Sequence, residues 1–470
     1  MGTETVEIAK GLERAVDGLR ASLRGELLSP GDPGYAESRR LFNAMIDKRP
    51  ALIVRCAGVA DVISAVEFAR SHALLVAVRG GGHNVTGNAL CEGGLVIDLT
   101  PMKGVWVDLD ARVARVQAGL TWAEVNHDLQ PFALAAAGGF VGTTGVAGLT
   151  LGGGFGWLVR KHGLACDNLR SVDLVTADGR LLTASEQEHP DLFWGLRGGG
   201  GNFGVATSFD FDIHPAGIVF AGVVIHPLER AGEAIRFWRD YAHTAPEEFT
   251  SAALLLTAPA APFVPEQAQG APVVGIGGVY TGPLDEAERA LRPLREFGPP
   301  VVDIFQPMPY SAAQTFIDFL WPSGNLNYWK SSFLRELSDQ AIETILDQFA
   351  RVPSPLTSVI IEHNGDGALE RVPAHATAFP HRGWTHNLLI PSLWHERADS
   401  EPNIAWTRAL FEAMQPFTPN AVYVNYLDNE GEQRVREAYG DDTYQRLVAL
   451  KNTYDPTNFF RLNQNIAPTA

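Results

Sequence analysis

The chain has 470 residues, of which 46% are hydrophobic, and its 37 Lys and Arg against 54 Asp and Glu give a net charge of −17. This length allows two or three domains with sizeable cores, and the composition excludes global disorder. The acidic excess is dispersed along the chain, and the negative surface that it produces disfavours nucleic acid and anionic membranes as partners.

Targeting and cysteine signals point to a reducing compartment. Residues 1–25 form an amphipathic pattern with charges throughout, without the apolar core and cleavage site of a signal peptide. No apolar run reaches the roughly 18 residues of a membrane span. The cysteines Cys56, Cys91 and Cys166 have neither disulfide-framework nor metal-ligand spacing. We therefore expect a cytoplasmic monomer or homodimer without a metal site.

From about residue 51 to 211, short strands alternate with helices and many glycines. Apolar runs predict strands at 51–56, 74–80 and 94–99, with a helix over 58–72 between the first two. Residues 105–119 predict a hairpin that turns at 108–111. A helix over 121–132 begins with Thr121 and has Glu124 three residues later, which is the pattern of a capping box.

The pattern changes between about residues 217 and 417. Amphipathic helices are predicted at 227–244, 284–298 and 337–352, and strands at 272–280, 358–363 and 385–391. This alternation indicates an antiparallel sheet covered by helices, and an α+β fold class overall. The tail is rich in Asn and aromatic residues. We predict three segments with boundaries at 1–217, 218–417 and 418–470.

Three glycine clusters stand out in the first segment: "RGGGHN" at 79–84, "GTTGVAGLTLGGGFGWL" at 142–158 and "GLRGGGGNFGVAT" at 195–207. Consecutive glycines free backbone N–H groups to face an anion such as a pyrophosphate. Three clusters within about 130 residues favour a long ligand laid along the backbone, although glycine-rich turns between packed strands remain an alternative. A nicotinamide Rossmann site is disfavoured, since no strand–GxGxxG–helix unit appears.

These clusters, together with "DLFWGLRGGGGNFGVAT" and the terminal "YDPTNFFRLNQNI", resemble the berberine-bridge-enzyme-like family of FAD-linked oxidases. That family belongs to the vanillyl-alcohol-oxidase superfamily with PCMH-type FAD-binding domains. The resemblance implies an FAD-binding domain made of residues 1–217 and 418–470. It also implies a substrate-binding domain over 218–417. Because the motifs are specific for fold and cofactor only, the substrate stays open.

In the family, the histidine after R-x-G-G bonds covalently to the 8α-methyl carbon of the flavin, and His83 stands at that place. Many members form a second link through a cysteine, where this chain has Val141. Cys166 lies some 25 residues later and is interpreted as a small buried side chain. The resemblance therefore implies a single histidyl link, as in the subgroup of bacterial hydroxynicotine oxidase.

The motifs imply a set of FAD-binding residues around the three glycine clusters and the tail. They are His83, Arg79, Gly80, Gly81, Gly82, Asn84, Gly87, Thr143, Thr144, Gly145, Gly148, Gly152, Gly153, Val205, Asn425, Asn463 and Asn465.

For the catalytic base, "AVYVNYLD" resembles the family's Y-x-N-Y motif and points to Tyr423 and Tyr426. A free tyrosine has a pKa near 10, so it needs a nearby cation or an oriented donor to act as a base. Lys330 is the candidate cation, or else a solvent-exposed lysine. The alternative for both tyrosines is packing against the flavin.

Plant members carry an acidic or amide residue on a strand after an H-R pair, here followed by residues 383–394. Rough alignment puts Leu389 at that position, so we expect no carboxylate base there. His386 and Asn387 on the same strand are candidate substrate contacts, and a structural role is the alternative for His386.

Together these features predict an FAD-dependent oxidase. Hydride would pass from an alcohol or amine carbon of a small substrate to covalent FAD, and then to molecular oxygen with release of hydrogen peroxide. Two alternatives stay open: a dehydrogenase with a quinone or carrier acceptor, and a flavin-holding protein without turnover.

Overall fold

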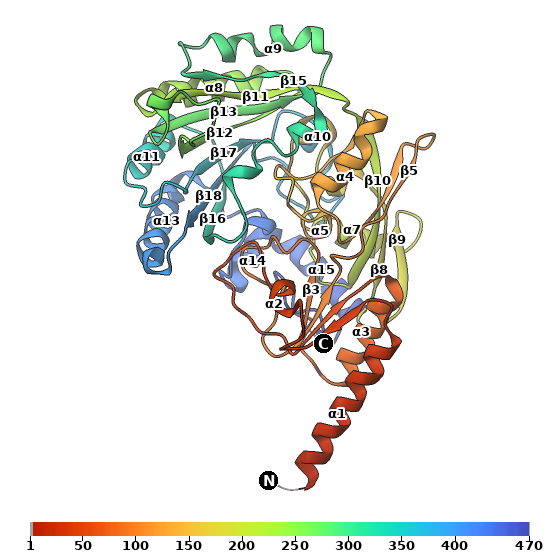
Figure 1. Ribbon diagram of the computed structural model, residues 1–470. Coiled ribbons are helices and arrows are strands. Elements are labelled where there is room, and N and C mark those ends of the chain that lie inside the picture. The colour runs from red at the N-terminus through yellow and green to blue at the C-terminus, as the bar shows by residue number, and fades with distance from the viewer. Residues whose placement is uncertain (1–2, 470) are drawn as a thin grey trace.

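The computed structural model describes the backbone of residues 3–469 and side chains from residue 13 onward. Helix α1 (Thr3–Ser22) extends away from the body of the protein, with the N-terminus at its far end (Figure 1). Over the described residues, no helix is both long and apolar enough to cross a membrane.

The first sheet has the order β1-β2-β4-β3 and ends at the first glycine cluster. Strands β2 (Leu52–Arg55), β4 (Leu95–Asp98) and β3 (Val76–Arg79) are parallel, and β1 (Glu26–Leu28) is antiparallel to β2. Helix α3 (Val59–Ser71) connects β2 to β3, which confirms the predicted strand–helix–strand unit. The segment "GGGHN" therefore begins directly after β3, at the edge of this sheet.

The second sheet follows the order β5-β6-β10-β8-β9, with β7 (Leu134–Ala136) also paired to β10. Strands β5 (Val105–Asp108) and β6 (Val113–Gln117) form the predicted hairpin. The other strands are β8 (Leu169–Val175), β9 (Leu181–Ser185) and β10 (Val205–Pro215).

Short helices connect the elements around these two sheets. Helix α4 (Trp122–Leu129) begins at Thr121 with both reciprocal bonds to Glu124, which confirms the capping box. The others are α2 (Tyr35–Ser38), α5 (Val146–Leu151), α6 (Val159–His162) and α7 (Pro190–Leu196).

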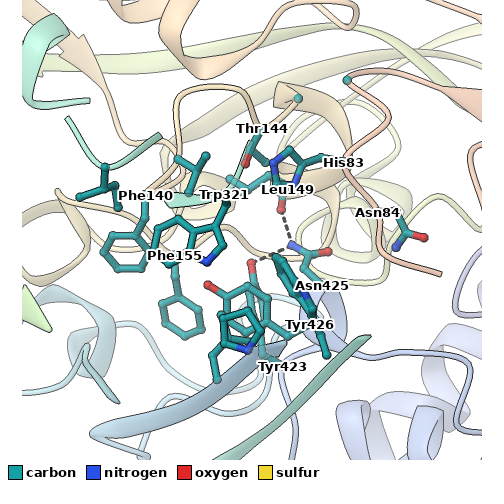
Figure 2. A pocket seen from close by; sticks show the side chains of 18 of the residues that line it. His83, Asn84, Phe140, Thr144, Leu149, Phe155, Trp321, Tyr423, Asn425 and Tyr426 are labelled. Atoms are coloured by element: carbon teal, nitrogen blue, oxygen red, sulfur yellow. Dashed lines mark hydrogen bonds between the residues drawn. The ribbon is translucent and has the colours of Figure 1, made fainter. Parts of the chain in front are cut away.

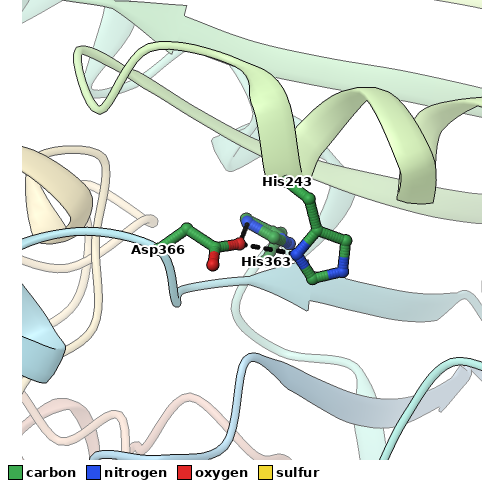
Figure 3. A group of neighbouring side chains, drawn as sticks. All are labelled: His243, His363 and Asp366. Atoms are coloured by element: carbon green, nitrogen blue, oxygen red, sulfur yellow. Dashed lines mark hydrogen bonds and ion pairs between the residues drawn. The ribbon is translucent and has the colours of Figure 1, made fainter.

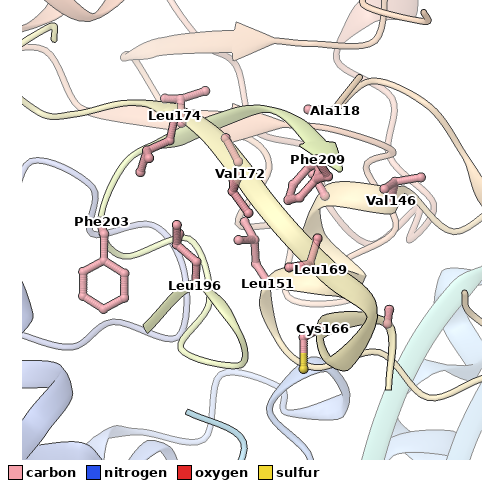
Figure 4. Close-up of a cluster of buried hydrophobic side chains, with 14 of the residues drawn as sticks. Ala118, Val146, Leu151, Cys166, Leu169, Val172, Leu174, Leu196, Phe203 and Phe209 are labelled. Atoms are coloured by element: carbon pink, nitrogen blue, oxygen red, sulfur yellow. The ribbon is translucent and has the colours of Figure 1, made fainter. Parts of the chain in front are cut away.

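A single apolar core joins the two sheets and their helices. Figure 4 shows part of it, which includes Leu174 and Phe209 of the second sheet, Leu151 of α5 and Cys166.

The eight-stranded third sheet is antiparallel and lies between residues 218 and 394, with the order β14-β11-β13-β12-β17-β18-β16 and β15 beside β11. Its strands are β11 (Ile218–Pro227), β12 (Phe249–Thr257), β13 (Pro272–Tyr280), β14 (Val302–Asp303), β15 (Gln306–Pro309), β16 (Leu326–Leu334), β17 (Val359–His363) and β18 (His386–Trp394).

Four helices cover one face of this sheet (Figure 1): α8 (Ala231–Thr244), α9 (Leu284–Glu296), α11 (Asp339–Phe349) and α13 (Ser400–Met414). Side chains alternate between the faces because the period of a strand is two. Ala253 and Leu255 pack with the helices, whereas Ala252 and Leu254 lie in the cluster on the other face. The α+β class with a helix-covered antiparallel sheet is thereby confirmed.

The end of the chain returns to the first two sheets. Helices α14 (Glu432–Tyr439) and α15 (Asp441–Tyr454) contribute Val435, Tyr439 and Leu447 to the core that the glycine-rich segments share. The tail then lies against the third glycine cluster, where Asn463 Nδ2 donates to the Gly201 carbonyl at 3.1 Å. Short helices α10 (Tyr310–Ala313) and α12 (Ala368–Arg371) complete the described elements.

Candidate active site

A cavity of about 540 Å³ lies between the glycine-rich loops and the uncovered face of the third sheet. Its lining includes His83, Thr144, Glu362, Tyr423 and Tyr426. Figure 2 shows His83 and Thr144 on one side, the two tyrosines on another, and the aromatic side chains of Phe140, Phe155 and Trp321 around them. Residues far apart in sequence thus meet in one space.

Two of the glycine clusters are in direct contact at the cavity wall. A Cβ atom added to Gly81 would lie 2.6 Å from the backbone of Gly145, so both positions need glycine for this approach. At Gly148 and Gly201, which also line the cavity, an added Cβ would meet nothing within 4 Å. The backbone of these loops is therefore exposed to the cavity rather than covered by side chains.

His83 follows the first glycine run and lies at the cavity. The Phe42 ring stacks on its imidazole with 4.0 Å between the centroids, and Thr143 Oγ1 lies 3.4 Å from Nε2. Burial lowers the pKa of His83 to about 4. The imidazole is therefore neutral near pH 7, with a nitrogen lone pair available for bonding.

The two tyrosines are placed by one short turn. Residues Val424–Tyr426 form a 3₁₀ turn in which the Tyr426 N–H donates to the Tyr423 carbonyl at 3.0 Å. Side chains three residues apart eclipse on such a turn, so both rings lie on the cavity side. Their centroids are 4.9 Å apart.

Asn425, between them, joins the turn to the second glycine cluster. Its Nδ2 donates to the Leu149 carbonyl at 2.9 Å and to the Tyr423 hydroxyl at 2.7 Å, as the dashed lines in Figure 2 mark. An added Cβ at Gly152 would lie 2.0 Å from Asn425 Oδ1, so glycine is required there too. The Gly154 N–H also donates to the Tyr423 hydroxyl at 2.9 Å, which therefore accepts two bonds.

Tyr426 has a different partner. Its hydroxyl donates to Glu362 Oε1 at 2.8 Å, and Asn387 Nδ2 donates to Glu362 Oε2 at 3.0 Å. Ser331 Oγ donates to Asn387 Oδ1 at 3.1 Å and so fixes the orientation of that amide. Asn364 Nδ2 adds a longer bond of 3.4 Å to Glu362 Oε2. Among the described residues that line the cavity, Glu362 carries the only carboxylate, and three donors hold it.

Burial raises the pKa of Glu362, while bonds from Asn387 and Tyr426 act in the opposite direction. Burial also raises the pKa of Tyr426 well above its usual value, and the Glu362 charge raises it further. Tyr423 has its pKa raised by burial as well. Both phenols are therefore protonated near neutral pH, and the carboxylate is the acceptor to which Tyr426 can pass a proton.

The cavity contains a carboxylate that the sequence analysis did not identify, at a different position from the one considered there. Leu389 on β18 lines the cavity and carries no carboxyl group, as expected, but Glu362 enters from the neighbouring strand β17. The β17–β18 register sets Glu362 opposite Asn387. The available signal was a single acid within the apolar run "SVIIEH", because a charged residue in a buried strand is rarely without a role.

Lys330 does not reach the cavity. Strand alternation points Trp329 into the cavity and Lys330 to the opposite face of β16. There its Nζ pairs with Glu430 Oε2 at 2.6 Å, beside the Phe411 ring. No Lys or Arg occurs among the described residues that line the cavity. The cation that the sequence suggested for the tyrosines is therefore not supplied by this lysine.

His386 also faces away, toward α8. Its Nε2 lies 3.2 Å from His363 Nδ1, and His363 belongs to the cluster with His243 and Asp366 that Figure 3 shows. Asp366 Oδ2 lies 2.7 Å from His243 Nδ1 and 3.1 Å from His363 Nε2. This cluster fastens α8 to the end of β17, on the face opposite the cavity.

The other sequence-derived cofactor residues divide into two groups. Residues that line the cavity are Gly80, Gly81, Gly82, His83, Asn84, Thr144, Gly145, Gly148, Asn425 and Asn463. The rest are outside this lining: Gly87, Gly152, Gly153, Val205 and Asn465, together with Arg79 and Thr143, which line a second cavity that also borders on Gly81 and His83.

Val141 lines the cavity, whereas Cys166 lies in the fully buried core shown in Figure 4, outside the lining. Burial raises the pKa of the Cys166 thiol well above its usual value, which disfavours a reactive thiolate.

The cavity fits a flavin dinucleotide. The exposed glycine backbone offers N–H groups for phosphates. The Oδ1 atom of Asn463 is buried at the cavity and has no hydrogen-bond partner among the described residues, although such atoms are normally satisfied. The neutral imidazole of His83 and the aromatic walls suit a flat ring system.

Residues 50–185 match the FAD binding domain family, and residues 422–467 match the family described as berberine and berberine like. The FAD-linked oxidoreductase YgaK of Bacillus subtilis is 32% identical over 96% of this chain and 98% of its own length. The (R)-6-hydroxynicotine oxidase of Paenarthrobacter nicotinovorans is 31% identical over 95% of this chain and 97% of its own. The crystal structure of 6-hydroxy-D-nicotine oxidase from Arthrobacter nicotinovorans superposes with a TM-score of 0.85 at 28% identity, covering 95% of this chain and 98% of that one.

Proposed function

Because the chain belongs to the berberine-bridge-enzyme-like family of FAD-linked oxidoreductases, we propose that it is an oxidase of an alcohol or amine carbon. Bound FAD would supply the hydride acceptor and, once reduced, the electrons that convert oxygen to hydrogen peroxide. The FAD would be held by the glycine loops and Asn463, with a single covalent bond through His83. The protein would provide the proton acceptor, the orientation of the substrate and a cavity that excludes water.

The hydrogen bond between Tyr426 and Glu362 is the observation that carries this proposal. Oxidation of an alcohol or amine carbon requires a proton to leave oxygen or nitrogen as hydride leaves carbon. The Tyr426 hydroxyl would accept that proton while it passes its own to Glu362 Oε1. The raised pKa of Tyr426 keeps its hydroxyl protonated, so this step does not use a free tyrosinate. The buried Glu362 carboxylate takes up the proton and becomes a neutral acid.

Anaerobic mixing of the holoenzyme with a panel of alcohols and amines tests the proposal. A substrate should bleach the oxidised flavin absorbance, and admission of air should restore it with one peroxide formed per substrate. Fast reoxidation by a quinone with slow reoxidation by air would instead identify a dehydrogenase. Bound flavin that no member of the panel reduces would indicate a flavin-holding protein.

Thr144 is expected to control access of oxygen to the flavin. It lines the cavity in the loop between Val141 and Gly145, three residues after the place of the family's second flavin link. A small side chain at this place resembles oxidases of the family, and leucine resembles dehydrogenases. The change Thr144→Leu should slow reoxidation by air at least tenfold, since the longer side chain fills space beside the cavity.

The measurement is stopped-flow reoxidation of the reduced enzyme at several oxygen concentrations. Thr144→Val serves as the matched control because it nearly preserves the volume and removes only the hydroxyl. Equal reoxidation rates in Thr144→Leu and wild type would show that this side chain is not the gate.

A further inference from the structure

The face of the third sheet that lines the cavity carries one ionisable side chain, Glu362. The other lining residues on strands β11, β13, β12, β17, β18 and β16 are apolar or glycine: Gly222, Val223, Ile225, Gly275, Gly277, Ala252, Leu254, Leu256, Ile360, Leu389, Pro391 and Trp329. On these six strands a ligand therefore finds an ionisable side chain only where Glu362 meets Tyr426, and the amide of Gln306 on the outer strand β15 lines the cavity beside β11 at the other end.

The strand register places the smallest side chains directly beside that end. Glu362 lies opposite Ala252 on β12, Ala252 opposite Gly277 on β13, and Gly277 opposite Val223 on β11. Neighbouring strands are about 4.8 Å apart, so Gly277 lies roughly 10 Å and Val223 roughly 14 Å across the sheet from Glu362. The small side chains of Ala252 and Gly277 leave a trough that starts at the proton acceptor.

Larger side chains border this trough on β17, β12 and β11, whereas β13 has a second glycine there. The adjacent row along the sheet contains Ile360 opposite Leu254 and Gly275 opposite Ile225. Outside the sheet, the lining is rich in aromatic rings: Phe140, Phe155, Trp157, Phe316, Phe319 and Trp321. Such rings favour offset or edge-to-face contact with another ring.

We propose that the substrate is an elongated, largely apolar molecule, about two aromatic rings long. Its oxidisable alcohol or amine carbon lies at the Tyr426–Glu362 pair, and its ring system extends over Ala252 and Gly277 toward Val223. An oligosaccharide is excluded, because most of its hydroxyl groups would be buried against this wall without partners, which is costly. The position of the oxidisable carbon rests on the proposed function, whereas the shape and polarity of the substrate are inferred from the cavity wall alone.

Three probes test the substrate class on the holoenzyme: 4-biphenylmethanol, benzyl alcohol and cellobiose. Dissociation constants come from perturbation of the flavin spectrum, and reduction rates from anaerobic bleaching. The biphenyl probe should bind about 10–100-fold more tightly than benzyl alcohol, because its second ring is buried against apolar surface. Cellobiose should cause no spectral change at millimolar concentration. Tighter binding of cellobiose than of the biphenyl probe would overturn the inference.

The change Gly277→Val tests the position of the trough. A Cβ at Gly277 would lie 3.4 Å from the Gly222 carbonyl oxygen and 3.7 Å from Val223, which is ordinary contact that the fold accommodates. The added methyl groups should weaken the biphenyl probe at least tenfold and leave benzyl alcohol within about twofold, since only the longer molecule reaches this place.

Gly277→Ala provides a smaller change of the same sign, should the valine variant fail to fold. The matched control is Gly18→Val on α1, where nothing lies within 4 Å of an added Cβ. Equal weakening of both alcohols in Gly277→Val would overturn the assignment of the trough. Tight binding of the biphenyl probe without flavin reduction would support the inferred shape of the substrate and contradict only the proposed oxidation.

Discussion

Replacement of Glu362 by glutamine is expected to slow anaerobic flavin reduction by about 10²–10⁴-fold, the contribution of one positioned base. Glutamine has nearly the shape of glutamate and can still accept the hydrogen bond from Tyr426. The glutamine amide cannot take up a proton, so the proton that leaves the substrate through Tyr426 has no final acceptor. Tyr426→Phe should cause a loss in the same range, because it removes the group between substrate and carboxylate.

The double variant Glu362→Gln with Tyr426→Phe should be little slower than either single variant. Residues that act as one unit have non-additive effects, since the loss of either disables both. Tyr310→Phe is a matched control: its hydroxyl is buried without a partner among the described residues, and it lies outside the cavity lining. Flavin reduction within about threefold of wild type in Glu362→Gln would rule out this carboxylate as the proton acceptor.

The pH dependence of flavin reduction gives an independent measurement of the same pair. Burial raises the pKa of Glu362 above the usual value of 4.5. As the pH falls through this raised pKa, the carboxylate is protonated and can no longer accept a proton, so the rate should fall. The decline should therefore occur at higher pH than for an ordinary glutamate. It should be absent from the residual rate of Glu362→Gln.

The glycine-rich lining of the cavity could be predicted from sequence because its signals are local. The run "RGGGHN" has a strand before it and a histidine within it, and the structure places both β3 and His83 at the cavity. The strand, hairpin and capping-box predictions succeeded for the same reason. Each depends on residues within one element, where periodicity and turn chemistry are direct consequences of backbone geometry.

The proton acceptor could not be predicted in this way, because it depends on register between strands. Glu362 and Tyr426 are 64 residues apart, and they meet because β17 pairs with β18 in the register that sets Glu362 opposite Asn387 on the cavity face, where the turn Val424–Tyr426 brings Tyr426. A shift of one residue would turn Glu362 to the helix-covered face. The same alternation separates Lys330 from the cavity, although its neighbour Trp329 lines it. Residue type alone carries no information on which face a strand presents.

The second large effect concerns the flavin link. In the wild type, protein precipitated with acid should stay yellow, and a flavin-bearing peptide should contain His83. His83→Ala should release all of its flavin on denaturation, because the imidazole is the only nucleophile that we assign to the bond. Its neutral state near pH 7 follows from the pKa of about 4. The Phe42 ring, which stacks on it, restricts its orientation.

Loss of the bond should also lower the flavin reduction potential, and with it the rate of hydride uptake, while noncovalent FAD still binds to the glycine loops. Cys166→Ser is the matched control, since this thiol is fully buried in the core and lies outside the cavity lining. It should keep its flavin after acid treatment. A flavin-bearing peptide that contains Cys166, or retained colour in His83→Ala, would contradict a single histidyl link. A flavin bond to Cys166 would require the core around this residue to open toward the cavity, and the packing of Leu151 and Phe203 in the same cluster opposes such an opening.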